Sequence, residues 1–158
     1  MAQSQAPTIT RPQLIELLNE DLSREYQAVI AYVNYSQVLK GAKYMSIAKE
    51  LEAHAHEELA HALTIAGQID YLGGMPTVTA SPVRQSDKPD EMLRFDLENE
   101  NITVANYRTR LRQCESLGEY AIAESIRLIL VQEQEHQVDL ANALGIDVPD
   151  LSSEQQQA

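Results

Sequence analysis

Residues 57–61 read EELAH and residues 132–136 read QEQEH, and each stretch contains a Glu-x-x-His pair. Glu58 precedes His61, and Glu133 precedes His136. Residues three apart lie on one face of an α-helix, so each pair presents a carboxylate and an imidazole side by side. The two pairs are 75 residues apart, and the chain contains no other Glu-x-x-His. This spacing predicts a helical protein built from two similar halves.

Two further glutamates follow the same repeat. Glu25 and Glu100 are also 75 residues apart, and their surroundings match. The stretch Asp21-Leu22-x-x-Glu25-x-x-x-Val29-x-x-Tyr32 recurs as Asp96-Leu97-x-x-Glu100-x-x-x-Val104-x-x-Tyr107. Each half is therefore predicted to contain one helix with a glutamate, followed by a second helix with Glu-x-x-His.

Proline and glycine residues delimit four predicted helices. These run from Thr10 and Pro12 to about Leu39, from Lys43 to Leu72, from Asp90 to about Ser116, and from Glu119 to Leu144. Short turns join the first helix to the second and the third to the fourth, so each pair is expected to form an antiparallel hairpin. The proline-rich loop at about 75–89 can span roughly 46 Å when extended. Helices of this length are about 38 Å long, so the loop can cross the whole bundle.

We therefore expect an all-α fold: a four-helix bundle of two antiparallel hairpins with one long crossover. Residues 1–158 form one domain in this interpretation, with the bundle at about 10–145 and a polar tail at 146–158.

Glu25 and Glu100 occupy positions that apolar side chains fill elsewhere on the same helical face. In the first predicted helix this face reads Leu18, Leu22, Glu25, Val29 and Tyr32, in alternating steps of four and three residues. The pattern places six ionisable side chains inside the bundle: Glu25, Glu58, His61, Glu100, Glu133 and His136. A buried carboxylate without a partner is costly. Because no Lys or Arg falls on these faces near the six residues, we expect metal ions to balance them.

The donor set suits two divalent ions. Four carboxylates carry four negative charges, which two divalent ions neutralise when neutral imidazoles complete the site. Carboxylate and imidazole ligands suit iron or manganese, and zinc can also occupy such sites. Two metals about 3.5–4 Å apart can share bridging carboxylates and act together on one small molecule.

Composition excludes several other classes of protein. The formal charge is −12, so a nucleic-acid binder, which needs clustered Lys and Arg, is not expected. Cys114 is the single cysteine, which rules out an intrachain disulfide and fits a reducing compartment. No membrane span or signal peptide is visible, and the predicted location is cytoplasmic.

With these motifs, residues 14–145 resemble the bacterioferritin branch of the ferritin-like superfamily. The stretch Asp90-Glu91-Met92-Leu93-Arg94-x-Asp96-Leu97 before Glu100 is also similar to that family. The resemblance implies a ferroxidase, in which two Fe(II) ions are oxidised by O₂ or H₂O₂ and the ferric product is stored in a homo-oligomeric cage.

The resemblance also implies individual roles. Glu58 and Glu133 would bridge the two irons, Glu25 and Glu100 would be terminal carboxylates, and His61 and His136 would each bind one iron. Tyr32 matches the family's tyrosine beside the site and is the predicted catalytic residue, as a donor of a hydrogen bond or an electron. Tyr107 repeats Tyr32 but is expected to be a core residue.

Two departures from the family matter. Bacterioferritins bind haem through a methionine directly after the glutamate of the second helix, and here that position is Leu59, so haem is not expected. The family also has a short fifth helix that lines a channel of its 24-subunit cage. Pro149 and the polar tail disfavour that helix, which leaves a 12-subunit cage open beside the 24-mer.

Three alternatives remain open from the residues. A rubrerythrin-like di-iron peroxidase or oxidase would not store iron; the extra glutamate of that family is missing, because Leu97 and Thr103 flank Glu100 by three. A dimanganese catalase and a bundle that holds metal only for stability are the others. His54 is either a third metal ligand or a supporting polar histidine, and Glu57 is expected at the surface.

Overall fold

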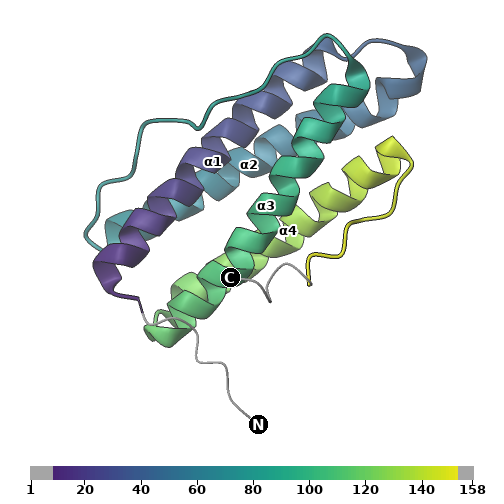
Figure 1. Ribbon diagram of the computed structural model, residues 1–158. Helices are drawn as coiled ribbons and strands as arrows, with labels where there is room; N and C mark the ends of the chain where they lie inside the picture. Colours follow the sequence, from purple (N-terminus) through teal and green to yellow (C-terminus); the bar gives the residue numbers. More distant parts are fainter. Residues whose placement is uncertain (1–8, 153–158) are drawn as a thin grey trace.

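The computed structural model describes residues 9–152 and contains four long α-helices (Figure 1). They are α1 (Arg11–Val38), α2 (Met45–Tyr71), α3 (Pro89–Ser116) and α4 (Tyr120–Leu144), and a 3-10 turn, Ala42–Tyr44, precedes α2. At 25 to 28 residues, each helix is about 40 Å long. The predicted all-α bundle is confirmed, and the helix bounds agree with the predicted ones within a few residues.

Local sequence accounts for the ends of the helices. The Thr10 side chain accepts a hydrogen bond from the backbone N–H of Gln13, and the Gln13 side chain accepts one from the backbone of Thr10. This reciprocal capping starts α1. Gly145 ends α4 with φ at 69°, which lets the backbone N–H of Ile146 bond to the carbonyl of Ala141.

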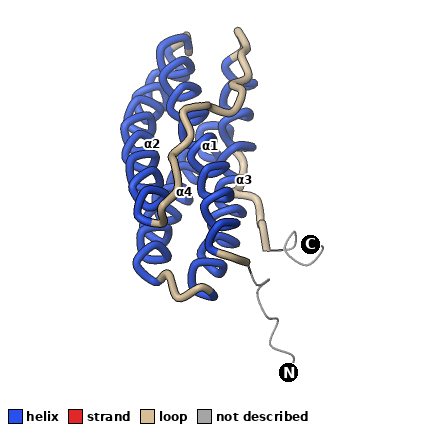
Figure 2. The backbone as a smooth tube through the Cα atoms, turned by 90° about the vertical axis from the view of Figure 1, so that its left-hand side faces the viewer, coloured by secondary structure: helices blue, strands red, loops and turns tan. Residues whose placement is uncertain are grey.

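The four helices form two antiparallel hairpins, α1 with α2 and α3 with α4, which pack against each other (Figures 1 and 2). One long connection leads from the end of α2 to the start of α3, at the opposite end of the bundle. The predicted topology, two hairpins with one crossover, is confirmed.

The crossover is attached to α1 along its length. Asn19, Ser23 and Gln27 lie at successive turns of α1, and their side chains donate hydrogen bonds to backbone carbonyls at residues 75, 79 and 82. The backbone N–H of Ser81 also bonds to the carbonyl of Ser23, at 3.0 Å. The connection is therefore a hydrogen-bonded strap and not a free loop.

The apolar core is divided into two clusters. One lies at the end of the bundle where α1 begins, and its buried members include Leu18, Ile65 and Ile126. The other lies where α1 ends and includes Tyr35 and Leu93. Each cluster draws on all four helices. The helix midpoints, between the two clusters, are occupied by buried ionisable side chains.

Two local expectations need correction. Val29 is only partly buried. The side chains of Glu25 and Tyr32 on α1 point into the bundle, whereas Val29 lines a pocket on the outer surface. The predicted polar tail, 146–158, is not polar and exposed throughout, since Leu151 within it is buried. Residues 146–152 contain no helix, and residues 153–158 of the predicted tail lie outside the described residues. Within residues 9–152, no helix is long and apolar enough to cross a membrane.

Candidate metal centre

The six side chains predicted from the sequence meet at the middle of the bundle. They come one or two from each helix: Glu25 from α1, Glu58 and His61 from α2, Glu100 from α3, Glu133 and His136 from α4. None of them is more than 3% exposed. The six side chains are therefore almost completely shielded from bulk water.

His61 directs its Nδ1 atom at three carboxylates. This nitrogen lies 3.0 Å from Oε2 of Glu58, 3.3 Å from Oε1 of Glu133 and 3.6 Å from Oε2 of Glu25. These atoms form one group whose ligand atoms all lie within 4.8 Å of one another. Such a spacing suits a single metal ion with mixed nitrogen and oxygen ligands.

His136 faces the cluster in the same way from the other hairpin. Its Nδ1 atom lies 3.0 Å from Oε1 of Glu58, 3.2 Å from Oε2 of Glu133 and 3.5 Å from Oε1 of Glu100. These residues form a second group of ligand atoms within 4.8 Å. Glu58 and Glu133 belong to both groups, so they are placed to bridge two ions.

Both imidazoles are held from behind at Nε2. The Nε2 atom of His136 lies 2.6 Å from a carboxylate oxygen of Glu57, and that of His61 lies 2.6 Å from the amide oxygen of Gln132. When the imidazole is neutral and donates its Nε2–H to that oxygen, Nδ1 is the nitrogen left to bind a metal ion, and it faces the cluster. Glu57 and Gln132 are 75 residues apart, so they are repeat partners. Glu57 is partly exposed, in keeping with the expected surface position, but its carboxylate also contacts His136.

Glu25 and Glu100, the outer glutamates, each belong to only one of the two ligand groups. Each of them accepts a hydrogen bond from a tyrosine of the opposite hairpin. The hydroxyl of Tyr32 donates to Oε1 of Glu100, and that of Tyr107 donates to Oε1 of Glu25. Burial, together with the neighbouring carboxylates, raises the pKa of both phenols well above the usual value, so both keep their protons. Tyr107 lies in the core as expected, but it also has the same contact as Tyr32. The 75-residue repeat was the signal for this second role.

One buried arginine lies one turn of α3 beyond a tyrosine that contacts the cluster. Arg110 is buried one turn beyond Tyr107, because its guanidinium pairs with Asp21, Nε to Oδ2 at 2.7 Å. It also donates to the side chain of Gln113. These partners occupy the guanidinium, so among the described residues no Lys or Arg forms an ion pair with the six cluster residues.

Without metal, protons balance part of the cluster's charge. Burial and the neighbouring carboxylates raise the pKa of Glu58 and Glu100. Burial also disfavours a charged imidazole, but the surrounding carboxylates favour it more strongly and raise the pKa of His61 and His136. Burial and the charge of Glu25 disfavour the ionised form of Glu133, yet the two imidazoles outweigh them and lower its pKa. Metal ions would replace these protons.

The hydrogen-bond inventory also fits a metal. Several buried atoms that face the cluster lack a hydrogen-bond partner: Oε2 of Glu25, Oε1 of Glu58, Oε2 of Glu100, both carboxylate oxygens of Glu133, and Nδ1 of His136. Buried polar atoms without a partner are rare and costly. Here they point to the same space and are all metal-ligand atoms, so two ions would satisfy the set.

His54 and Leu59 lie outside this set. His54 is buried, and its ring stacks on His136 with 4.0 Å between centroids. Burial and the neighbouring His136 lower the pKa of His54. Leu59 is half exposed beside a pocket between α1 and α2. The absence of haem stays a prediction.

This fold and this cluster define a class. A bundle with one glutamate on each of two helices and Glu-x-x-His on each of the other two has the donor arrangement of ferritin-like metal–carboxylate proteins. Residues 15–147 match the family described as Ferritin-like domain. The chain belongs to that family.

Relatives support the resemblance to bacterioferritins. The chain is 30% identical to the bacterioferritin of Brucella melitensis over 141 residues, which cover 85% of this chain and 88% of the relative. It is 28% identical to the bacterioferritin of Desulfovibrio desulfuricans, over 80% of this chain and 71% of the relative. The predicted family is therefore confirmed.

Solved structures share the fold. A ferritin-like di-iron carboxylate protein from Bacillus anthracis has a TM-score of 0.82 and 30% identity, and the match covers 85% of this chain and 96% of that one. A dodecameric thioferritin from Bacteroides fragilis has a TM-score of 0.80 and 24% identity, over 94% of this chain and 92% of that one. At that identity the second likeness concerns the fold alone.

Proposed function

We propose that this protein is a ferroxidase that binds two Fe(II) ions in the cluster, oxidises them with O₂ or H₂O₂, and stores the ferric product in a homo-oligomeric cage. The observation that carries the proposal is the pair of overlapping ligand groups that share Glu58 and Glu133. Two metals bridged by shared carboxylates can act together on one small molecule.

Each cluster residue has a role in this proposal. Glu58 and Glu133 bridge the ions, and each ion has one further carboxylate and one imidazole. The ligands of one ion are completed by Glu25 and His61, and those of the other by Glu100 and His136. Two divalent ions neutralise the four carboxylates, and the orphaned oxygens gain partners.

The chain's own groups position the ions and control protons. Two Fe(II) ions supply two electrons, which suffice to reduce O₂ to H₂O₂ or H₂O₂ to water. Tyr32 holds Glu100 by its hydroxyl and lies edge-on to His136, with 5.9 Å between ring centroids. It is therefore placed to donate a hydrogen bond or an electron beside the ions. Tyr107 holds Glu25 in the matching place.

Storage is the part of the proposal that rests on relatives. The relatives in Brucella melitensis and Desulfovibrio desulfuricans are named bacterioferritins. We propose a cage of 24 or 12 copies of this chain, located in the cytoplasm.

The test is an aerobic Fe(II) titration of metal-free protein that follows ferric absorbance and particle size together. We expect fast oxidation up to about two Fe per chain, followed by slower growth of a soluble ferric core inside a large particle. Glu25→Gln and Glu100→Gln keep the side-chain shape and remove a ligand charge, so they should abolish the fast phase. Glu20→Gln, at an exposed position on α1, is the matched control and should oxidise iron normally.

Two other outcomes would contradict the proposal. Saturation at two Fe per chain, with no further soluble uptake, would indicate a rubrerythrin-like di-iron peroxidase or oxidase without storage. Oxidation no faster than background, and equal in all variants, would leave a bundle that holds metal only for stability.

A further inference from the structure

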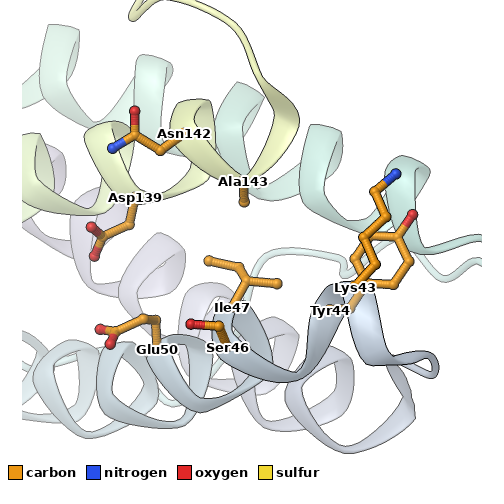
Figure 3. A pocket seen from close by; sticks show the side chains of 8 residues that line it. All are labelled: Lys43, Tyr44, Ser46, Ile47, Glu50, Asp139, Asn142 and Ala143. Atoms are coloured by element: carbon orange, nitrogen blue, oxygen red, sulfur yellow. The ribbon is translucent and has the colours of Figure 1, made fainter.

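A surface pocket lies between the start of α2 and the end of α4 (Figure 3). It has a volume of about 230 Å³, and its lining includes Ser46, Glu50, Asp139 and Asn142. Figure 3 shows the carboxylates of Glu50 and Asp139 at one end of this pocket, one from each helix, and Lys43 at the other end. Two carboxylates on separate helices therefore meet at a solvent-accessible position.

A buried histidine completes this group. His54 is one turn beyond Glu50 on α2 and only 2% exposed. Its Nε2 atom lies 3.0 Å from Oδ2 of Asp139. One ligand atom from each of Glu50, His54 and Asp139 lies within 4.8 Å of the others. One nitrogen and two carboxylate oxygens at this spacing are a donor set for a divalent first-row metal.

The charge of the group is not balanced by protein cations. Among the described residues, the one ion pair of Asp139 is with His54, and Glu50 has none. With a neutral imidazole, the group carries two negative charges at the mouth of the pocket. A divalent cation would neutralise both.

The group adjoins the buried cluster without sharing a residue with it. The ring of His54 stacks on that of His136, with 4.0 Å between centroids and 26° between planes. Asp139 follows His136 by three residues on α4, so both lie on one face of the helix. The group thus lies between the pocket and the dinuclear cluster, and the stacked rings of His54 and His136 connect the two.

We propose that Glu50, His54 and Asp139 form a third metal site, which binds a divalent transition-metal ion, and that this site loads Fe(II) toward the His136 side of the cluster. The loading role rests on the proposed ferroxidase function, whereas metal binding at the site does not. The repeat partner of His54 is Ile129, so the second half of the repeat supplies no symmetric counterpart of this site.

Co²⁺ is the probe for binding. Crystals of the full chain soaked in Co²⁺ should show an anomalous difference peak between the three side chains. The Glu50→Gln/Asp139→Asn variant should lose this peak and bind its weakest Co²⁺ at least about tenfold less tightly in solution. Glu135→Gln, at an exposed position on α4, is the control and should keep both. No peak in the wild type, or an unchanged peak in the double variant, would overturn the site.

Two further measurements separate this proposal from the ferroxidase proposal. In the Glu25→Gln/Glu100→Gln chain the dinuclear cluster is impaired, and the Co²⁺ peak at the third site should remain; its loss would overturn an independent site. In stopped-flow oxidation at two Fe(II) per chain, the Glu50→Gln/Asp139→Asn variant should react at least about tenfold more slowly than Glu135→Gln. Equal rates would overturn the loading role and leave the metal site.

Discussion

The two imidazoles of the cluster are held at Nε2 by different groups. His136 has the carboxylate of Glu57 behind it, whereas His61 has the amide of Gln132. A carboxylate behind a ligating imidazole makes that imidazole a stronger base and a better ligand than an amide does. The two proposed metal positions, which are otherwise related by the repeat, are therefore chemically unequal.

Exchanging these two partners should change metal affinity in opposite directions. We expect Glu57→Gln to weaken the tighter of the two binding steps by about tenfold, and Gln132→Glu to strengthen the weaker step. Anaerobic calorimetric titration of metal-free protein with Co²⁺ resolves the steps. The reciprocal variant is the control for general damage. Affinities that stay unchanged, or that fall in both variants, would contradict this assignment.

Protonation of the cluster should make the metal-free protein less stable as the pH rises. The pKa values of His61 and His136 are raised above the usual 6.5 in the folded state, so their stabilisation is full below that pH and is lost as the pH rises above it. The pKa values of Glu58 and Glu100 are also raised, so their contribution to stability likewise falls as the pH rises above 4.5. The lowered pKa of Glu133 makes stability rise with pH instead, but only below about pH 4.5.

Urea unfolding in the presence of a chelator tests this sign. The free energy of unfolding of metal-free protein should be lower at about pH 8 than at about pH 6. Adding Co²⁺ should remove or reverse the difference, because metal ions replace the protons. A chain with His61→Gln and His136→Gln should show a smaller dependence on pH. Equal stability of the metal-free wild type at both values would contradict the assignment.

At the scale of the elements, the end of α2 depends on one close approach. A Cβ atom added at Gly74 would lie 2.5 Å from Cγ2 of Ile15 on α1 and 3.1 Å from Cγ2 of Ile69. The backbone there has an ordinary φ, so space alone excludes a side chain. This contact sets how closely the start of the crossover lies on the first hairpin.

A pair of glycine substitutions tests that packing. Gly74→Ala should lower the free energy of unfolding by about 1–3 kcal/mol, because the methyl group overpacks the contact with Ile15. Gly67→Ala is the matched control, since it lies within α2 with open space around its Cα. It should raise stability by about 1 kcal/mol through helix propensity. Urea denaturation measures both changes, and a neutral Gly74→Ala would show that Ile15 moves aside without cost.

The helices and the six cluster residues were predictable because they depend on local periodicity and on the 75-residue repeat. Glu25 falls on an apolar face of its own helix, and Glu58 and His61 share a face by spacing alone. The contacts between hairpins were not predictable in this way. The hydrogen bond from the Tyr107 hydroxyl to Glu25 and the contact between Glu57 and His136 both join two hairpins. They therefore depend on how one hairpin is rotated against the other.

At the scale of the whole molecule, one face carries exposed apolar side chains on both helices of the first hairpin. Val33 on α1 and Leu59 on α2 line one pocket there, and Leu63 follows one turn beyond Leu59. Several large apolar side chains on one face favour contact with another protein surface. In the proposed cage, a second copy of this chain would cover this face.

A charge on that face should change the size of the particle. Leu63→Arg places a cation at a side chain that is 69% exposed in the single chain, so it should cost little stability and yet reduce the mass of the assembly. Leu128→Arg, at 63% exposure on α4, is the matched control outside this face and should assemble normally. Light scattering after size-exclusion chromatography measures the mass. Full-size particles for Leu63→Arg would place the subunit contact elsewhere.

The tyrosine contacts have a consequence for how such a molecule can arise. Each outer glutamate accepts a hydrogen bond from a tyrosine of the other hairpin, Glu25 from Tyr107 and Glu100 from Tyr32. A single hairpin would therefore leave its own outer glutamate without this hydrogen bond. Two copies of one hairpin would meet every requirement of the centre. That is the pattern expected when a gene for a symmetric dimer duplicates and fuses. Later divergence at single positions, such as His54, could then add chemistry to one half alone.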